Sequence, residues 1–139
     1  KKKKKKSSRT LYGVSKGIPP LVKSMVIQKK VRSVGFDWEE ESQVLNKIDE
    51  EISELKTEIK NKNYKKIKSE IGDLFFSIIN YARFIGVDPE EALEKTNVKF
   101  IKRFNFMEDK ILKDGKKFKE MSLKEMDEYW EISKLEENE

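Results

Sequence analysis

The stretch IKSEIGDLFFSIINYARFI, residues 67–85, decides the fold class. On a helical wheel its apolar side chains cover one broad face and continue round the back. A narrow polar stripe remains, formed by Glu70, Asp73, Ser77 and Asn80. A helix this apolar is expected at the centre of a bundle, where its two carboxylates would face other helices instead of water. Because burying ionised carboxylates is costly, we expect them to meet a cation.

The preceding segment supplies a second set of carboxylates. Its apolar residues recur at helical spacing over 44–59, and Glu51 and Glu54 lie three residues apart at the edge of that apolar arc. The short turn at 61–63 predicts that the two helices pack antiparallel. Four carboxylates would then converge between them: Glu51, Glu54, Glu70 and Asp73. An all-oxygen cluster suits Mg²⁺ or Mn²⁺.

The acidic residues of the first of these helices also fit a simpler interpretation. Taken alone, Glu50, Glu51 and Glu54 are typical of the solvated face of a lysine-rich helix. The pair Glu70 and Asp73 argues against this interpretation, because it lies in the most apolar helix of the chain and has no basic neighbour in the following two turns.

Helix start and stop signals divide the rest of the chain into further helices. Pro19 and Pro20 begin one that ends near Gly35, and Asp37 is the expected N-cap of the helix that carries Glu51. The later signals are Gly86 as a stop, Asp88-Pro89-Glu90 as a start, Gly115 as a stop, and the capping box Ser122 to Glu125. No stretch alternates with period two. We therefore predict an all-α fold, a four-helix-type bundle plus a short C-terminal helix.

Composition excludes several classes of protein. The 139 residues suit one domain, and they include no cysteine and no histidine. Disulfide frames, zinc knuckles, thiol nucleophiles and Ser-His-Asp hydrolases are therefore ruled out. No apolar run reaches the roughly 18 residues of a membrane span, and no secretory signal is recognisable. We expect a cytoplasmic protein that does not engage a membrane.

Basic charge is concentrated at the start of the chain. Residues 1–16 carry eight positive charges and no negative one, whereas 17–139 carry a net charge of −3. We interpret 1–16 as a basic flexible tail or linker and 17–139 as the helical domain. Since no aromatic residues interleave with the Lys1–Lys6 run, the pattern does not favour nucleic acid as a partner.

Positive side chains recur on the helix after Pro89. Lys99 and Arg103 are four residues apart on one face, where they could hold a phosphate chain bound to a metal on the carboxylates. An exposed amphipathic helix with Phe100 and Phe104 in the core fits equally well. Three other aromatic residues could stack a base but are more often core residues: Phe36, Trp38 and Trp130.

The carboxylate spacing is recognisable. Glu50-Glu51-Ile52-Ser53-Glu54 followed by Glu70-Ile71-Gly72-Asp73 resembles the E-E-x-x-E … E-x-x-D signature of the MazG family of nucleoside triphosphate pyrophosphohydrolases. The resemblance runs from about Leu11 to the C-terminal helix and is closest to the second, catalytic domain of tandem MazG proteins. Other pieces that carry it are residues 17–22, 28–30, 34–38, 72–76, 80–83, 97–104 and 126–130.

The resemblance implies an all-α fold that assembles as a homodimer, or a higher homo-oligomer, around Mg²⁺. It implies hydrolysis of a nucleoside triphosphate to the monophosphate and pyrophosphate. The residue roles that it implies are metal ligation by Glu51, Glu54, Glu70 and Asp73, with Glu50 close by; phosphate binding by Lys99 and Arg103; closure of the site by Trp130; and secondary substrate contacts by Asn80 and Asn97.

A mechanism follows from these charges. Without histidine, Glu50 or Glu51 is the expected group to orient or deprotonate the attacking water. Lys99 and Arg103 would stabilise charge on the departing pyrophosphate. The alternative of another class is a non-catalytic helical module that dimerises or regulates a partner.

Overall fold

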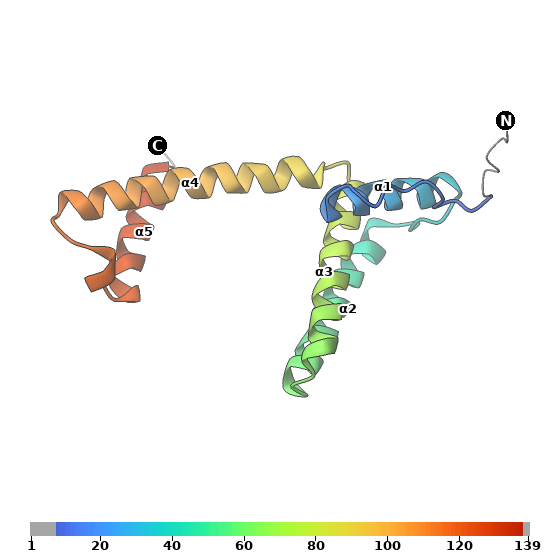
Figure 1. Cartoon of the computed structure of the whole chain (residues 1–139), viewed down its shortest axis with the longest axis horizontal. Coiled ribbons are helices and arrows are strands. Elements are labelled where there is room, and N and C mark those ends of the chain that lie inside the picture. Colours follow the sequence, from blue (N-terminus) through green and yellow to red (C-terminus); the bar gives the residue numbers. More distant parts are fainter. Residues whose placement is uncertain (1–7, 138–139) are drawn as a thin grey trace. The chain divides into compact units, whose positions relative to one another are not determined.

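The computed structural model describes residues 8–137, and within this range its regular elements are all helical. The elements are α1 (Pro20–Ser33), α2 (Glu41–Lys60), α3 (Tyr64–Phe84), α4 (Pro89–Lys113), the 3-10 turn η1 (Phe118–Glu120) and α5 (Leu123–Glu137) (Figure 1). The predicted all-α class is confirmed. The run Lys1–Lys6 lies outside the described residues. None of the helices in the described range is long and apolar enough to cross a membrane.

Side-chain caps fix the helix starts that the sequence predicts. The Asn63 Oδ1 accepts a hydrogen bond of 3.2 Å from the backbone of the first turn of α3, and the Asp88 Oδ1 accepts one of 2.9 Å in α4. In α5 the capping box is complete, because the Ser122 Oγ accepts from the Glu125 backbone N–H at 3.1 Å and the Glu125 Oε1 accepts from the Ser122 backbone N–H at 3.0 Å. Gly86, which follows α3, has a φ of 82°, a left-handed conformation that favours glycine.

The start of α2 differs from the prediction. The N-cap is Glu40 and not Asp37, and α2 begins three residues later than a cap at Asp37 would place it. The Gln43 Oε1 accepts a hydrogen bond from the Glu40 backbone N–H at 3.1 Å, which completes a reciprocal cap. Asp37 instead makes its contacts within the joint between α1 and α2.

The residues up to Glu90 form one compact unit. Its α2 and α3 run side by side as an antiparallel pair, and α1 packs against α3 at the end of the pair opposite its turn (Figure 1). Val44 of α2 and Ile79 of α3 are buried in this unit, and so is the polar side chain of Gln28 in α1. As expected of a central helix, α3 contacts both α1 and α2, but the prediction that both of its carboxylates face other helices is wrong for Asp73, which is exposed in the single chain.

One face of α3 is open in the single chain. Ile71, Phe75 and Ile78 recur at spacings of four and three residues and are all exposed, Phe75 by 63%. Large apolar side chains gathered on one exposed helix face are typical of a surface that meets another protein.

The residues from Glu91 onward form a second unit, described here by itself. Met107 and Ile111 of α4 are buried, and the ring of Phe100 lies 5.0 Å from that of Trp130 in α5. These contacts join α4 to α5, and they place Trp130 among the aromatic side chains of this unit.

Candidate metal centre

Three carboxylates from α2 and α3 come together in the first unit. Glu51 of α2 and Glu70 and Asp73 of α3 each offer one oxygen, and these oxygens all lie within 4.8 Å of one another. The tight turn at 61–63 makes the pair antiparallel, which brings residue 51 level with residues 70–73. Glu54, one turn along α2 from Glu51, interacts electrostatically with both Glu51 and Glu70.

The cluster contains buried acceptors that lack a donor. Glu51 is only 4% exposed, and its Oε1 has no hydrogen-bond partner among the described residues. The Glu70 Oε2 is likewise buried and unpartnered within the described chain. Buried polar atoms are almost always hydrogen-bonded, so two orphaned carboxylate oxygens in one cluster make it a candidate site for a cation.

The titration behaviour of the cluster agrees with this geometry. Burial, followed by the neighbouring Glu54, raises the pKa of Glu51 to about 7. Desolvation and the same Glu54 raise the pKa of Glu70 above its ordinary value. Carboxylates this close repel one another when ionised, so either protons or a cation must be bound to them.

Lys47 is a member of the site that the sequence analysis missed. Its Nζ lies 3.1 Å from the Glu50 Oε1 and 3.7 Å from the Glu51 Oε2. The hydrogen bond to Glu50 raises the pKa of Lys47. Spacings of three and four residues on one helix were the signal that could have found it. A single ammonium at the edge leaves the cluster with an excess of negative charge.

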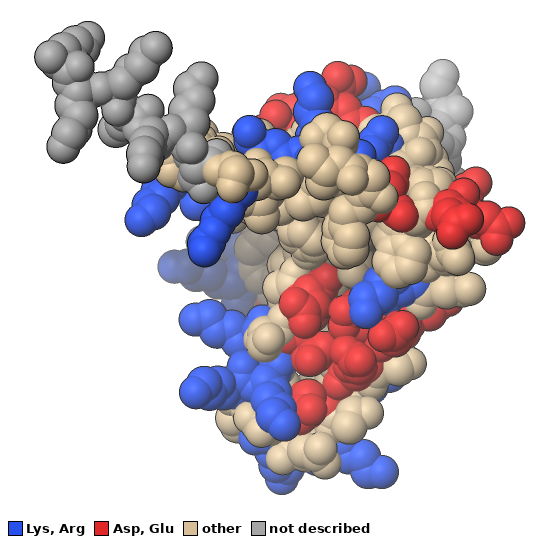
Figure 2. Space-filling model, turned by 90° about the vertical axis from the view of Figure 1, so that its right-hand side faces the viewer, with Lys and Arg blue, Asp and Glu red and all other residues tan. Residues whose placement is uncertain are grey.

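The donor set fits a hard divalent cation. All of its ligand atoms are carboxylate oxygens, which Mg²⁺, Mn²⁺ and Ca²⁺ prefer, whereas softer metals prefer nitrogen or sulfur. Figure 2 shows one face of the molecule, on which acidic side chains gather over α2 and α3 with basic side chains beside them. Such a concentration of negative charge attracts cations to the cluster.

Two other predicted residues of the first unit lie outside the cluster. The side chain of Glu50 is 58% exposed and is held by Lys47 at the edge of the cluster. Asn80 lies two turns beyond Asp73 on α3 and lines a separate pocket.

The remaining predicted residues belong to the second unit. Lys99 borders a shallow depression on α4 together with Lys95 and Lys102, and Arg103 is half-buried. Asn97 is exposed and donates a hydrogen bond of 3.4 Å to Glu94. That these residues approach the carboxylates stays a prediction.

Comparisons with known proteins place the chain in a family. Residues 39–106 match the family described as the MazG nucleotide pyrophosphohydrolase domain, and this range contains all four carboxylates that the sequence predicts as ligands. The matched segment also spans α2, α3 and the larger part of α4.

Individual relatives agree with the family match. The chain is 44% identical over 131 residues to the Thermotoga maritima protein named nucleoside triphosphate pyrophosphohydrolase/pyrophosphatase MazG. The alignment covers 94% of this chain and 50% of the Thermotoga protein. It is 35% identical over 129 residues to the Escherichia coli K12 nucleoside triphosphate pyrophosphohydrolase. That alignment covers 91% of this chain and 49% of the Escherichia coli protein. The chain thus spans about half the length of these two curated relatives. Residues 39–106, which carry the E-E-x-x-E and E-x-x-D segments, therefore belong to the MazG nucleotide pyrophosphohydrolase domain family.

Proposed function

We propose that this chain hydrolyses nucleoside triphosphates to nucleoside monophosphate and pyrophosphate, using Mg²⁺, with Mn²⁺ as a possible substitute. The observation that supports this most strongly is the pair of buried, unpartnered carboxylate oxygens on Glu51 and Glu70. Two relatives that match over more than nine tenths of the chain are named as nucleoside triphosphate pyrophosphohydrolases.

The proposed ligands are Glu51, Glu54, Glu70 and Asp73. A divalent cation supplies Lewis-acid polarisation of phosphate oxygens and lowers the pKa of a bound water. The chain contributes a preorganised set of oxygens, because α2 and α3 hold Glu51, Glu70 and Asp73 close together despite their repulsion. Because their pKa values are raised, Glu51 and Glu70 must lose any bound proton before they can ligate the cation.

Glu50 and Glu51 are the proposed groups that orient or deprotonate the attacking water. The contact of 3.1 Å from Lys47 fixes the Glu50 carboxylate at the exposed edge of the cluster, where water has access. Glu51 lies inside the cluster, where a carboxylate oxygen would be within reach of a water bound to the cation.

The positive side chains of α4 have the complementary role in this proposal. Lys99 and Arg103 would bind the phosphate chain and stabilise charge on the departing pyrophosphate. Asn80, Asn97 and Trp130 are proposed as further substrate contacts. The lysine-lined depression around Lys99 supports an anionic ligand on this face of α4.

We also propose that the protein is a homodimer or a higher homo-oligomer. The exposed apolar face of α3, formed by Ile71, Phe75 and Ile78, supports this assembly. In this proposal residues 17–139 are the catalytic domain, 1–16 are a basic tail, and the protein works in the cytoplasm, which its lack of cysteine supports.

The test is a screen of ribo- and deoxyribonucleoside triphosphates with Mg²⁺, with both products identified by ion-exchange chromatography. We expect monophosphate and pyrophosphate from the unmodified chain. We expect no turnover from Glu54→Gln or Asp73→Asn, with helix content unchanged by circular dichroism. Asp49→Asn is the matched control, because Asp49 is an exposed carboxylate of α2 outside the cluster. Full activity in either cluster variant would contradict the proposed site.

A second candidate is a non-catalytic helical module that dimerises or regulates a partner. The exposed apolar face of α3 favours it. This candidate predicts that no triphosphate in the screen yields pyrophosphate when Mg²⁺ is present, so the same experiment separates the two.

A further inference from the structure

The turn that joins α2 to α3 carries a concentration of positive charge. Residues 56–68 cover the end of α2, the turn at 61–63 and the start of α3, and they include six lysines and one acidic residue. Residues 17–139 as a whole carry a net charge of −3, so this positive charge is local. Figure 2 shows basic side chains gathered at the lower end of the α2–α3 pair. We name residues 56–68 the lysine tip, and its exposed lysines are Lys56, Lys60, Lys62, Lys65, Lys66 and Lys68.

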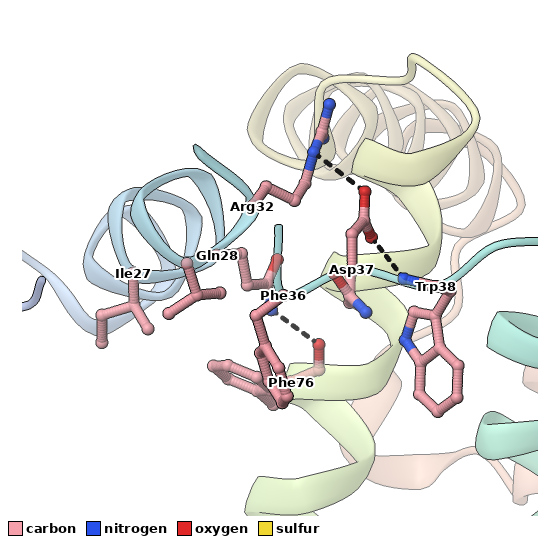
Figure 3. A pocket seen from close by; sticks show the side chains of 9 residues that line it. Ile27, Gln28, Arg32, Phe36, Asp37, Trp38 and Phe76 are labelled. Carbon is pink, nitrogen blue, oxygen red and sulfur yellow. Dashed lines mark hydrogen bonds and ion pairs between the residues drawn. The ribbon is translucent and has the colours of Figure 1, made fainter. Parts of the chain in front are cut away.

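The lysines of the tip are not held in ion pairs. Among residues 8–137, no ion pair joins any of the six to a carboxylate. Arg32 in the same unit differs, because its Nε lies 3.3 Å from the Asp37 Oδ2 at the wall of the pocket that Asn80 lines (Figure 3). Lysines at a spacing of three or four residues repel one another when no opposite charge is near. An anionic ligand at the tip would relieve that repulsion.

Two of these lysines occupy positions that the local backbone disfavours. Lys62 has a φ of 55°, and no other residue except glycine has a positive φ within the described chain. Glycine or asparagine adopts this conformation at lower cost. Lys65 lies in the first turn of α3, where a positive side chain opposes the helix dipole. Neutral residues would suit the fold better at both positions, and positions that break a local rule are often functional.

An exposed aromatic ring lies within the tip. Tyr64 is the first residue of α3 and is 76% exposed, between Lys62 and Lys65 in the sequence. Lys68 follows one helical turn later on the same face. A ring among lysines can stack an unpaired base while the ammonium groups contact the phosphates on either side of it. The run Lys1–Lys6 contains no aromatic residue, so this interpretation applies to the tip and not to the tail.

We propose that the lysine tip binds single-stranded nucleic acid, with a base stacked on Tyr64 and the phosphate chain along the lysines. Lysine is a point charge on a flexible stem, so these contacts hold the phosphate chain without reading its sequence. The positive charge alone would also fit an acidic protein or an anionic membrane. The exposed ring favours nucleic acid, because its bases present flat faces along the whole ligand. The proposal goes beyond nucleotide hydrolysis and does not depend on it.

The first test measures binding of fluorescein-labelled rU15 and dT15 to the full chain by fluorescence anisotropy at low salt. Tyr64→Ala and Tyr64→Leu should each raise Kd about tenfold, whereas Tyr64→Phe should keep it, because stacking needs the ring and not the hydroxyl. Phe36→Ala is the matched control, because Phe36 is equally exposed, at 76%, and lies outside the tip. No binding by the unmodified chain, or an unchanged Kd in Tyr64→Ala and Tyr64→Leu, would overturn the proposal. An equal loss in Phe36→Ala would do the same.

The second test compares two variants that each lose three positive charges. The first combines three changes in the tip: Lys60→Gln, Lys62→Gln and Lys65→Gln. The control combines three changes in the basic tail: Lys2→Gln, Lys3→Gln and Lys4→Gln. Three phosphate contacts to a single strand contribute about −2 to the slope of log affinity against log salt concentration. We expect the tip variant to lose about this much of the slope and the tail variant to keep most of it. A larger loss in the tail variant would show that the tail is the binding site.

Other polyanions and the assembly state complete the test. Tighter binding of phosphatidylserine vesicles, or of polyglutamate, than of either oligonucleotide at the same salt would assign the tip to a membrane or to an acidic protein. Tyr64 lies seven residues before Ile71 on α3, so light scattering should show the same assembly for Tyr64→Ala as for the unmodified chain. Weaker binding that accompanies dissociation would place the ring in the assembly face and overturn its stacking role.

The outcomes also separate this proposal from the proposed hydrolysis. Oligonucleotide binding that depends on Tyr64, without pyrophosphate release from any triphosphate, supports the tip and overturns the activity. Pyrophosphate release by a chain that binds neither oligonucleotide overturns the tip and leaves the hydrolase intact. Circular dichroism checks that each variant is folded.

Discussion

The two sites on α3 differ in how their polar atoms are left unsatisfied. At the carboxylate cluster, Glu51 and Glu70 each have a raised pKa and one buried oxygen without a partner among the described residues. Further along α3, in a mostly apolar pocket, the neutral amide oxygen of Gln28 from α1 is buried beside the helix. The first arrangement calls for a cation and the second for a neutral hydrogen-bond donor. One helix, α3, therefore borders two sites whose unsatisfied polar atoms differ in charge.

The largest effect is expected from removing a ligand of the cluster. Asp73→Asn should lower kcat by roughly 10²–10³ or more, because the charge that holds the catalytic cation is reduced. Binding of the oligonucleotides to the lysine tip should stay as in the unmodified chain, since the tip is untouched. A loss of that binding equal to the loss of kcat would show that the cluster and the tip are not separate sites. Steady-state kinetics and fluorescence anisotropy measure both quantities.

Metal binding should stabilise the cluster and leave the pocket unchanged. Adding Mg²⁺ to protein treated with a chelator should raise Tm by several degrees, because a ligand that binds only the folded state stabilises it. In Glu70→Gln we expect most of this shift to disappear, whereas Trp38→Ala, which alters the pocket, should retain it. A full Mg²⁺ shift in Glu70→Gln would contradict ligation by Glu70. Differential scanning fluorimetry is the measurement.

The pH dependence of stability should report on Glu51. Its pKa is raised from the ordinary value of 4.5 to about 7 in the folded chain, so the folded state holds a proton that the unfolded state has lost between these values. The stability that this proton provides is complete below the unfolded pKa and is lost as pH rises through the folded pKa. In the presence of a chelator, Tm should therefore fall by a few degrees more between about pH 5 and about pH 8 in the unmodified chain than in Glu51→Gln. Equal slopes would contradict the raised pKa.

The smallest effect is expected from a variant in the turn at 61–63, which aligns the carboxylates of α2 with those of α3. Asn63→Ala removes the side-chain cap of α3 and should lower the free energy of unfolding by about 1 kcal/mol, measured by urea denaturation. Asn61→Ala is the matched control, because Asn61 lies in the same turn but it is the Asn63 side chain that caps α3. An equal loss in both variants would contradict the capping role of Asn63.

The sequence predicted the cluster better than the pocket for a physical reason. Helical periodicity and a short turn are enough to bring Glu51, Glu70 and Asp73 together, since all three lie on two adjacent helices. Gln28 has no such local signal. It lies in a lysine-rich stretch of α1, and its Nε2 donates to the backbone carbonyl of Phe76, 48 residues away (Figure 3).

The helix boundaries show the same distinction. Caps that act within one turn, such as those of Asp88 and Ser122, were predicted from residue type and spacing. The start of α2 was not, because Asp37 is drawn instead to Arg32 at the end of α1, a contact between two different elements. Aspartate is a favoured N-cap residue, but residue type alone could not show that Asp37 pairs with Arg32 instead of capping α2.

The orphaned Glu51 oxygen has a consequence for the lifetime of the protein. A cluster that is strained without its cation makes the empty chain easier to open than the loaded one, and proteases attack opened chains. If the proposed cation binds there, its removal should make the folded chain easier to cleave, which limited proteolysis with and without a chelator would measure.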